Sequence, residues 1–142
     1  MGPIRIIVAD DFEPWRRSIV SIIEKHPGLV VIHEASDGLE AVQACLELQP
    51  DLVLLDVALP KLSGLEAARE IREASPESKI LFVSVMRNQD LVREALRIGA
   101  AGYIAKMDVG RDLLPAVIAA VADEEFLSFT VLPATETDLA EE

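Results

Sequence analysis

The sequence predicts an α/β protein in which helices cover both faces of a parallel β-sheet. Short apolar runs rich in β-branched residues recur five times, and a segment with apolar residues at helical spacing follows each run. Strands that are apolar along nearly their whole length are typical of parallel sheets buried on both faces. The alternation of strand and helix indicates the same architecture. The length of 142 residues fits a single domain.

The first half of the chain predicts two strands and two helices. The first strand covers 4–9, and the second covers 29–34 after a Pro-Gly turn signal. Asp37 and Glu40 have the spacing of a capping box and predict the start of the second helix. A helix at 13–25 is predicted by four apolar residues at helical spacing: Trp15, Ile19, Ile22 and Ile23.

The second half predicts three further strands and three helices. Ser63 and Glu66 form another capping box, which opens the third helix. The fourth helix is expected at 88–98 and the fifth at 111–123. Pro115 would then fall in the first turn of the fifth helix, where a missing N–H is tolerated. The strands are expected at 51–55, 79–83 and 101–105.

The chain is acidic, with a formal net charge of −12 at pH 7. Nucleic-acid backbones are bound by clustered Lys and Arg, so this charge argues against a nucleic-acid surface on the chain itself. Seven acidic residues and no basic residue occur from Asp123 to the end. We therefore expect one folded domain at 1–125 and a flexible acidic tail at 126–142.

The sequence predicts a soluble, cytoplasmic protein without a membrane partner. The N-terminus lacks a basic segment followed by a long apolar stretch. The apolar runs are shorter than the roughly 18 residues that a membrane span needs. The lone cysteine, Cys45, excludes an intrachain disulfide and is consistent with a reducing compartment.

Four of the five predicted strands end in polar or charged residues. In strand order these residues are Asp10 and Asp11, Asp56, Ser84, and Lys106. Each of them alone is most often a cap, a turn residue or a solvated side chain. Ligand sites of open α/β sheets lie outside the carboxyl ends of the strands. The ordered set therefore predicts one crevice in which three carboxylates, a hydroxyl and an ammonium converge.

This set of side chains predicts phosphoryl chemistry. Three close carboxylates repel one another, and a hard divalent cation such as Mg²⁺ removes the repulsion and takes oxygen ligands. Asp56 is the predicted nucleophile, which would form an aspartyl phosphate. Lys106 would supply further positive charge, and the Ser84 hydroxyl would donate a hydrogen bond to a phosphoryl oxygen.

Five short segments carry a pattern that extends beyond these side chains. They are Ala9–Asp11, Leu52–Pro60, Ser63–Glu66, Val83–Val85 and Gly99–Lys106. Together they resemble the receiver domain of bacterial response regulators, the phosphoproteins of two-component signalling. The resemblance covers residues 4–124. It implies a flavodoxin-like (βα)5 fold, a three-layer sandwich whose five-stranded parallel sheet has the order 2-1-3-4-5.

The resemblance implies a phosphorelay role for the crevice. Asp56 would accept phosphate from a histidine kinase or a histidine phosphotransfer protein. Asp11 and Asp56 would bind Mg²⁺ directly, Asp10 would do so through water, and the backbone carbonyl of Ala58 would be a further ligand. The chain would act in signal transduction and not as an enzyme, apart from self-phosphorylation by small donors and self-dephosphorylation.

A second implication concerns signal output. Ser84 and Tyr103 match the switch pair of the family. On phosphorylation the hydroxyl would move toward the phosphoryl group and the ring would turn inward. The face made by the fourth helix, the fifth strand and the fifth helix would then change shape, and it is also a possible homodimer surface. In the alternative interpretation, Tyr103 is a boundary residue with its hydroxyl in water.

The segments 64–72 and 99–117 are most similar to receivers of nitrate-response (LuxR-type) regulators, which carry a C-terminal helix-turn-helix domain. We expect a stand-alone receiver, with the receiver part of a truncated DNA-binding transcriptional regulator as the alternative. A phosphorylation-independent interaction module is a further alternative. A phosphatase of the haloacid-dehalogenase type is disfavoured, because it would need a second Asp where Ala58 stands.

Overall fold

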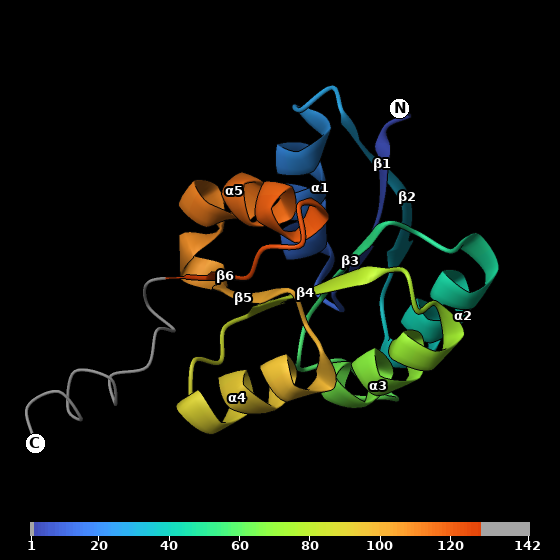
Figure 1. Ribbon diagram of the computed structural model, residues 1–142, viewed down its shortest axis with the longest axis vertical. Helices are drawn as coiled ribbons and strands as arrows, with labels where there is room; N and C mark the ends of the chain where they lie inside the picture. The colour runs from blue at the N-terminus through green and yellow to red at the C-terminus, as the bar shows by residue number, and fades with distance from the viewer. Residues whose placement is uncertain (1, 129–142) are drawn as a thin grey trace, which may run out of the picture.

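The computed structural model describes residues 2–128, and in this part of the chain six parallel strands form one sheet between two layers of helices (Figure 1). The strand order is β2-β1-β3-β4-β5-β6. The α/β class and the order 2-1-3-4-5 are therefore confirmed, and one strand is added at the β5 edge. The strands are β1 (Ile4–Ala9), β2 (Leu29–Ala35), β3 (Leu52–Leu55), β4 (Lys79–Ser84), β5 (Gly102–Ala105) and β6 (Phe126–Leu127).

The helices lie on both faces of the sheet, as the sequence predicts. Helices α1 and α5 cover one face, and α2, α3 and α4 cover the other (Figure 1). None of the helices among the described residues is long and apolar enough to cross a membrane. The helices are α1 (Glu13–Glu24), α2 (Gly38–Leu48), α3 (Gly64–Ala74), α4 (Gln89–Ile98) and α5 (Val109–Val121), with a 3₁₀ turn, η1, at Lys106–Asp108.

Two apolar clusters, one on each face of the sheet, form the core. Successive residues of a strand point to opposite faces. In β1, Ile7 packs on the side of α2, α3 and α4, whereas Ile6 and Val8 pack on the side of α1 and α5. All three side chains are buried, and burial of each contributes about 1.5–3 kcal/mol. The buried strands therefore hold their carboxyl ends at fixed places along one edge of the sheet.

The N-cap side chain of each predicted capping box makes its bond to the helix backbone. Asp37 Oδ1 accepts a hydrogen bond from the backbone N–H of Glu40 (2.8 Å) at the start of α2. Ser63 Oγ accepts one from the backbone N–H of Glu66 (3.2 Å) at the start of α3. These bonds satisfy N–H groups that have no partner within the helix itself.

Gly64 allows α3 to begin directly against the end of β3. Its N–H donates to the carbonyl oxygen of Val57 (2.7 Å). A Cβ at this position would lie 2.0 Å from the carbonyl oxygen of Asp56, a distance at which the backbone would have to shift. The absence of a side chain at Gly64 thus fixes α3 beside the predicted phosphorylation site.

The sixth strand is the main difference from the predicted five-stranded sheet. The Ser128 N–H donates to the carbonyl oxygen of Tyr103 (3.0 Å), and the buried Ser128 Oγ accepts from the Ala105 N–H (3.2 Å). The sequence assigned these residues to the tail because a two-residue strand shows no periodicity. The rest of the predicted tail, 129–142, lies outside the described residues.

The beginning of α5 is also different from the prediction. The 3₁₀ turn leads directly into the helix, which begins at Val109 and not at 111. Pro115 therefore lies in the interior of the helix, and the prediction that placed it in the first turn is wrong. Because proline has no N–H, the helical hydrogen bond to the carbonyl of Arg111 is missing. Burial of the sheet-facing side of α5 maintains the helix despite this loss.

We expect Gly102→Ala to destabilise the domain by displacing β6. A Cβ at Gly102 would lie 2.2 Å from the carbonyl oxygen of Phe126, so β6 would have to move away from β5. The expected loss in the free energy of unfolding is about 1–3 kcal/mol. Urea denaturation followed by circular dichroism measures this difference.

Gly110→Ala in α5 is the matched control. A Cβ at Gly110 meets nothing within 4 Å, and alanine is the better helix former. The free energy of unfolding of this variant should equal or exceed that of the wild type. If Gly102→Ala were as stable as Gly110→Ala, the close approach of β6 to β5 would be contradicted.

Candidate functional site

The predicted site residues come together at the carboxyl ends of the strands. Asp10 and Asp11 follow β1, Asp56 follows β3, Ser84 ends β4, and Lys106 follows β5. These four strands are consecutive neighbours in the sheet. The order of the strands therefore brings all five side chains to one edge, as the sequence predicts.

Three carboxylates form the centre of this edge. Asp10 and Asp56 are buried and Asp11 is exposed. One carboxylate oxygen from each lies within 4.8 Å of the other two. The cluster thus has two buried acids at its base and one acid at its solvent side, and it offers only oxygen ligands, the kind that Mg²⁺ prefers.

The Lys106 ammonium connects the two buried carboxylates. Its Nζ lies 2.7 Å from Asp10 Oδ2 and 2.9 Å from Asp56 Oδ2. Burial lowers the pKa of Lys106, but the hydrogen bonds and charges of the two carboxylates outweigh burial, so the pKa lies above its usual value. Lys106 therefore remains protonated and places a positive charge directly beside Asp56.

The backbone around Asp56 holds its carboxylate in place. The Asp56 N–H donates to the carbonyl oxygen of Ala9 (3.0 Å), and Asp56 Oδ1 accepts from the N–H of Ala58 (3.2 Å). Burial raises the pKa of the Asp56 carboxyl above its usual value, although Lys106 opposes this effect. One ammonium thus compensates only part of the cost of the buried negative charge. Ala58 itself is exposed, beside the carboxylate.

Arg16 supports Asp10 from α1, a contact that the sequence did not reveal. Its Nη1 donates to the carbonyl oxygen of Asp10 (2.9 Å), and its Nε donates to Glu34 Oε1 (3.0 Å). Asp10 Oδ1 also accepts from the N–H of Phe12 (2.9 Å). These bonds fix the loop that carries Asp10 and Asp11.

The predicted switch residues are linked through the backbone of Met86. Ser84 Oγ accepts from the Met86 N–H (3.1 Å), and the Tyr103 hydroxyl donates to the Met86 carbonyl oxygen (2.6 Å). Both side chains are buried, and burial raises the pKa of the Tyr103 hydroxyl. The alternative that Tyr103 is a boundary residue with its hydroxyl in water is therefore wrong. The Tyr103 ring lies in the interior of the domain.

An apolar hollow of about 310 Å³ lies beside Lys106. Its walls come from the loops after β1, β4 and β5 and from the first turn of α1. Three of its side chains are more than 60% exposed: Phe12, Val85 and Met107. The sequence did not indicate this group of exposed apolar side chains, because single apolar residues in loops have no periodicity.

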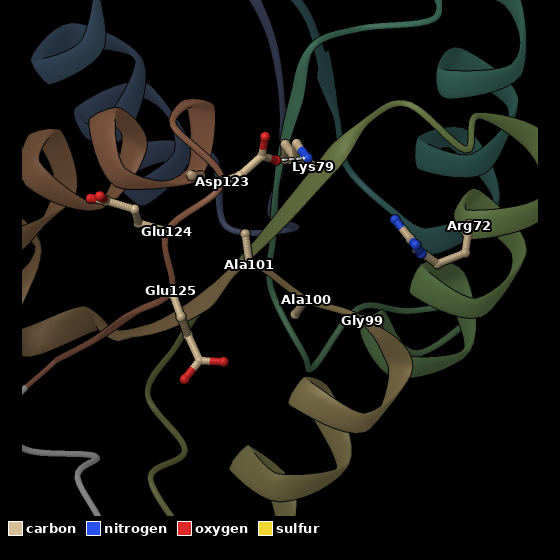
Figure 2. A pocket seen from close by; sticks show the side chains of 9 residues that line it. Arg72, Lys79, Gly99, Ala100, Ala101, Asp123, Glu124 and Glu125 are labelled. Atoms are coloured by element: carbon tan, nitrogen blue, oxygen red, sulfur yellow. Dashed lines mark hydrogen bonds and ion pairs between the residues drawn. The ribbon is translucent and has the colours of Figure 1, made fainter.

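A second hollow, of about 290 Å³, lies at the amino-terminal ends of β4 and β5, the end of the sheet opposite the Asp56 site. Figure 2 shows Lys79 paired with Asp123 across it, with Glu124 and Glu125 pointing away from this pair. This hollow contains none of the residues of the Asp56 site, and its charges are partly paired with each other.

Comparison with known proteins identifies the family. The response regulator receiver domain model matches residues 6–118, and the chain belongs to this family. The nitrate/nitrite response regulator protein NarL of Escherichia coli (strain K12) is 35% identical over 137 residues, which are 96% of this chain and 63% of NarL. The chain therefore spans less than two thirds of that relative.

Solved structures support the same assignment. A two-component response regulator of the LuxR family from Aurantimonas sp. SI85-9A1 has 31% identity and a TM-score of 0.88, with 99% of this chain and 97% of the other covered. The response regulator domain of Thermotoga maritima CheB has 31% identity and a TM-score of 0.78, with 84% and 97% covered. The fold and the receiver family thus agree with the resemblance that the sequence motifs indicate.

We expect Asp56→Asn to stabilise the metal-free protein. The substitution removes a buried negative charge that one ammonium compensates only in part, while Lys106 keeps its contact with Asp10. The gain in the free energy of unfolding should be about 1 kcal/mol, since active-site charges are commonly held at a cost in stability. Urea denaturation in the presence of a chelator measures it.

The control is Asp51→Asn, at the opposite end of β3. The Asp51 carboxylate is exposed, and it accepts a hydrogen bond from the Arg5 N–H (2.8 Å). Loss of its charge should bring no gain in stability. An Asp56→Asn variant less stable than the wild type would show that the Asp56 carboxylate does not destabilise the folded state.

Proposed function

We propose that the chain is a receiver that accepts a phosphoryl group on Asp56 from the phosphohistidine of a histidine kinase or a histidine phosphotransfer protein. The observation that carries this proposal is the Lys106 ammonium, 2.9 Å from Asp56 Oδ2 within a cluster of three carboxylates. A nucleophilic carboxylate, a fixed cation and an acidic metal-binding set are the parts that this transfer needs. Membership of the receiver family supports the same role.

The proposed reaction is a phosphoryl transfer between two side chains. An oxygen of the Asp56 carboxylate forms a bond to phosphorus while the bond from phosphorus to the donor imidazole nitrogen breaks. The electron pair of that bond stays on the imidazole, which takes up a proton. The Lys106 ammonium stabilises the negative charge of the phosphoryl oxygens. Its contact with Asp56 places it there before the donor arrives.

The residues of the site fit Mg²⁺. Asp11 and Asp56 would hold the ion directly and Asp10 through water, with the backbone carbonyl of Ala58 as a further ligand. Three carboxylates with one compensating ammonium leave excess negative charge, which a divalent cation would balance. When bound, the ion would neutralise charge on the phosphoryl oxygens.

The same proposal extends to the output of the signal. The Ser84 hydroxyl would move to donate a hydrogen bond to a phosphoryl oxygen. It would thereby lose the hydrogen bond that it now accepts from the Met86 N–H. Met86 lies in the loop between β4 and α4, and its carbonyl oxygen accepts a hydrogen bond from the Tyr103 hydroxyl of β5. A shift of this loop would therefore change the positions of β5 and α4. The predicted output face of α4, β5 and α5 would then bind a downstream partner or a second copy of the chain. Because β6 pairs with the outer edge of β5 in residues 2–128, this face includes β6.

The setting of this receiver is also a proposal. We place it in the cytoplasm as a stand-alone receiver that binds neither nucleic acid nor membrane itself. The alternative is the receiver part of a DNA-binding regulator, which the LuxR-family relative keeps open. The mass of the protein expressed from its natural gene distinguishes the two, because a DNA-binding domain would make the product much larger.

We expect the wild type to gain one phosphoryl group from acetyl phosphate in the presence of Mg²⁺. Asp56→Asn should gain none, because an amide oxygen is a poor nucleophile and forms no acyl phosphate. Intact-protein mass spectrometry measures the gain, with a chelator as the metal-free condition. Asp51→Asn, which leaves the site untouched, should be phosphorylated like the wild type. Equal uptake by Asp56→Asn would rule out Asp56 as the acceptor.

We expect Ser84→Ala to uncouple phosphorylation from the output face. The variant keeps Asp56 and Lys106 but loses the hydroxyl that joins the phosphoryl group to the Met86 loop. Hydrogen exchange of α4 and β5, compared before and after phosphorylation, should change much less than in the wild type. Ser21→Ala, an exposed serine on α1, is the control and should respond fully. A full response in Ser84→Ala would remove Ser84 from the switch.

A further inference from the structure

The Lys106 ammonium has a third neighbour besides the two carboxylates. Its Nζ lies over the ring of Trp15, 5.6 Å from the ring centroid. At this distance an ammonium is attracted by the negative face of an indole, and the attraction grows where water is excluded. The Lys106 side chain is only 13% exposed. The ammonium is therefore held between two carboxylates and one aromatic face.

Packing holds the Trp15 ring in place. Trp15 is the third residue of α1, and its ring packs against the apolar cluster on the side of α1 and α5. Its Nε1 is buried and has no hydrogen-bond partner among residues 2–128. Because no such bond is lost when the indole is replaced, phenylalanine is a close substitute: it keeps an aromatic face at this place and removes little else.

We infer that Trp15 is a positioning residue for phosphoryl transfer, whose ring holds the Lys106 ammonium over Asp56. The inference rests on the proposed function. A lysine side chain has four flexible methylene groups, and fixing it costs conformational entropy. The ring adds a third contact to the ammonium, besides those with the two carboxylates, and so limits where the ammonium can move.

The transfer itself gives this restraint its importance. While the bond from phosphorus to the donor nitrogen breaks and the bond to the Asp56 oxygen forms, the ammonium must pass from a carboxylate oxygen to a phosphoryl oxygen. A lysine held over the site makes this shift without first being desolvated and ordered. Trp15 lies on α1 and Lys106 on η1, so their contact also restrains these two elements relative to each other.

The test compares Trp15→Leu with Trp15→Phe. Initial rates of phosphorylation by acetyl phosphate with Mg²⁺ are measured by intact-protein mass spectrometry. We expect Trp15→Leu, which keeps apolar volume but no aromatic face, to be about five- to tenfold slower than the wild type. Trp15→Phe should stay within about twofold, because a benzene ring still attracts the ammonium. Thermal melting checks that both variants are folded.

The outcomes separate this inference from the proposed function. A wild type that takes up no phosphoryl group overturns both. A phosphorylated wild type with Trp15→Leu equally fast overturns the inference alone. So does a Trp15→Phe variant as slow as Trp15→Leu, because the indole would then act through its volume and not through its aromatic face.

A spectroscopic measurement tests the contact without any phosphoryl donor. Trp15 is the single tryptophan of the chain, so its fluorescence reports this site alone. Removing the nearby charge in Lys106→Met, which keeps a similar apolar stem, should shift the emission maximum relative to the wild type. Identical spectra of the two folded proteins would overturn the inference, even if Trp15→Leu failed to fold.

Discussion

The shared ammonium of Lys106 is the interaction on which the arrangement of this domain depends. Two buried carboxylates, Asp10 and Asp56, come from the neighbouring strands β1 and β3, and both contact one Nζ atom that follows β5. Without that cation the two charges would repel each other in an environment that hardly solvates them. The ends of three strands must therefore be held at the distance that one lysine can bridge.

The rest of the fold keeps those strand ends in register. Gly64 lets α3 start against the backbone of Asp56, and Gly102 lets β6 pair closely beside β5. The buried Ser128 then accepts the N–H of Ala105, the residue immediately before Lys106. The strand that the sequence did not predict thus supports the backbone of the lysine at the centre of the site. The Ser128 N–H also donates to the carbonyl oxygen of Tyr103, whose hydroxyl donates to the carbonyl oxygen of Met86. The site and Tyr103 are therefore linked through Ser128.

Features with a strong local signal could be predicted from the sequence, and features that depend on packing could not. The five short apolar runs revealed five strands, and the polar residues after them revealed the carboxylate cluster. The strand β6 has only two residues and no periodicity. The contact of Trp15 with Lys106 joins two distant parts of the chain, so spacing alone could not show it. Pro115 was expected in the first turn of the fifth helix, but it lies in the interior, where burial of the helix outweighs the missing hydrogen bond.

Reductive trapping of the acyl phosphate tests the central claim most directly. Borohydride reduces an aspartyl phosphate to homoserine with loss of phosphate, and peptide mapping then locates the modified residue. The account predicts homoserine at residue 56 alone, after incubation with a phosphoryl donor and Mg²⁺. Homoserine at Asp10 or Asp11, or at no residue of a phosphorylated sample, would contradict it.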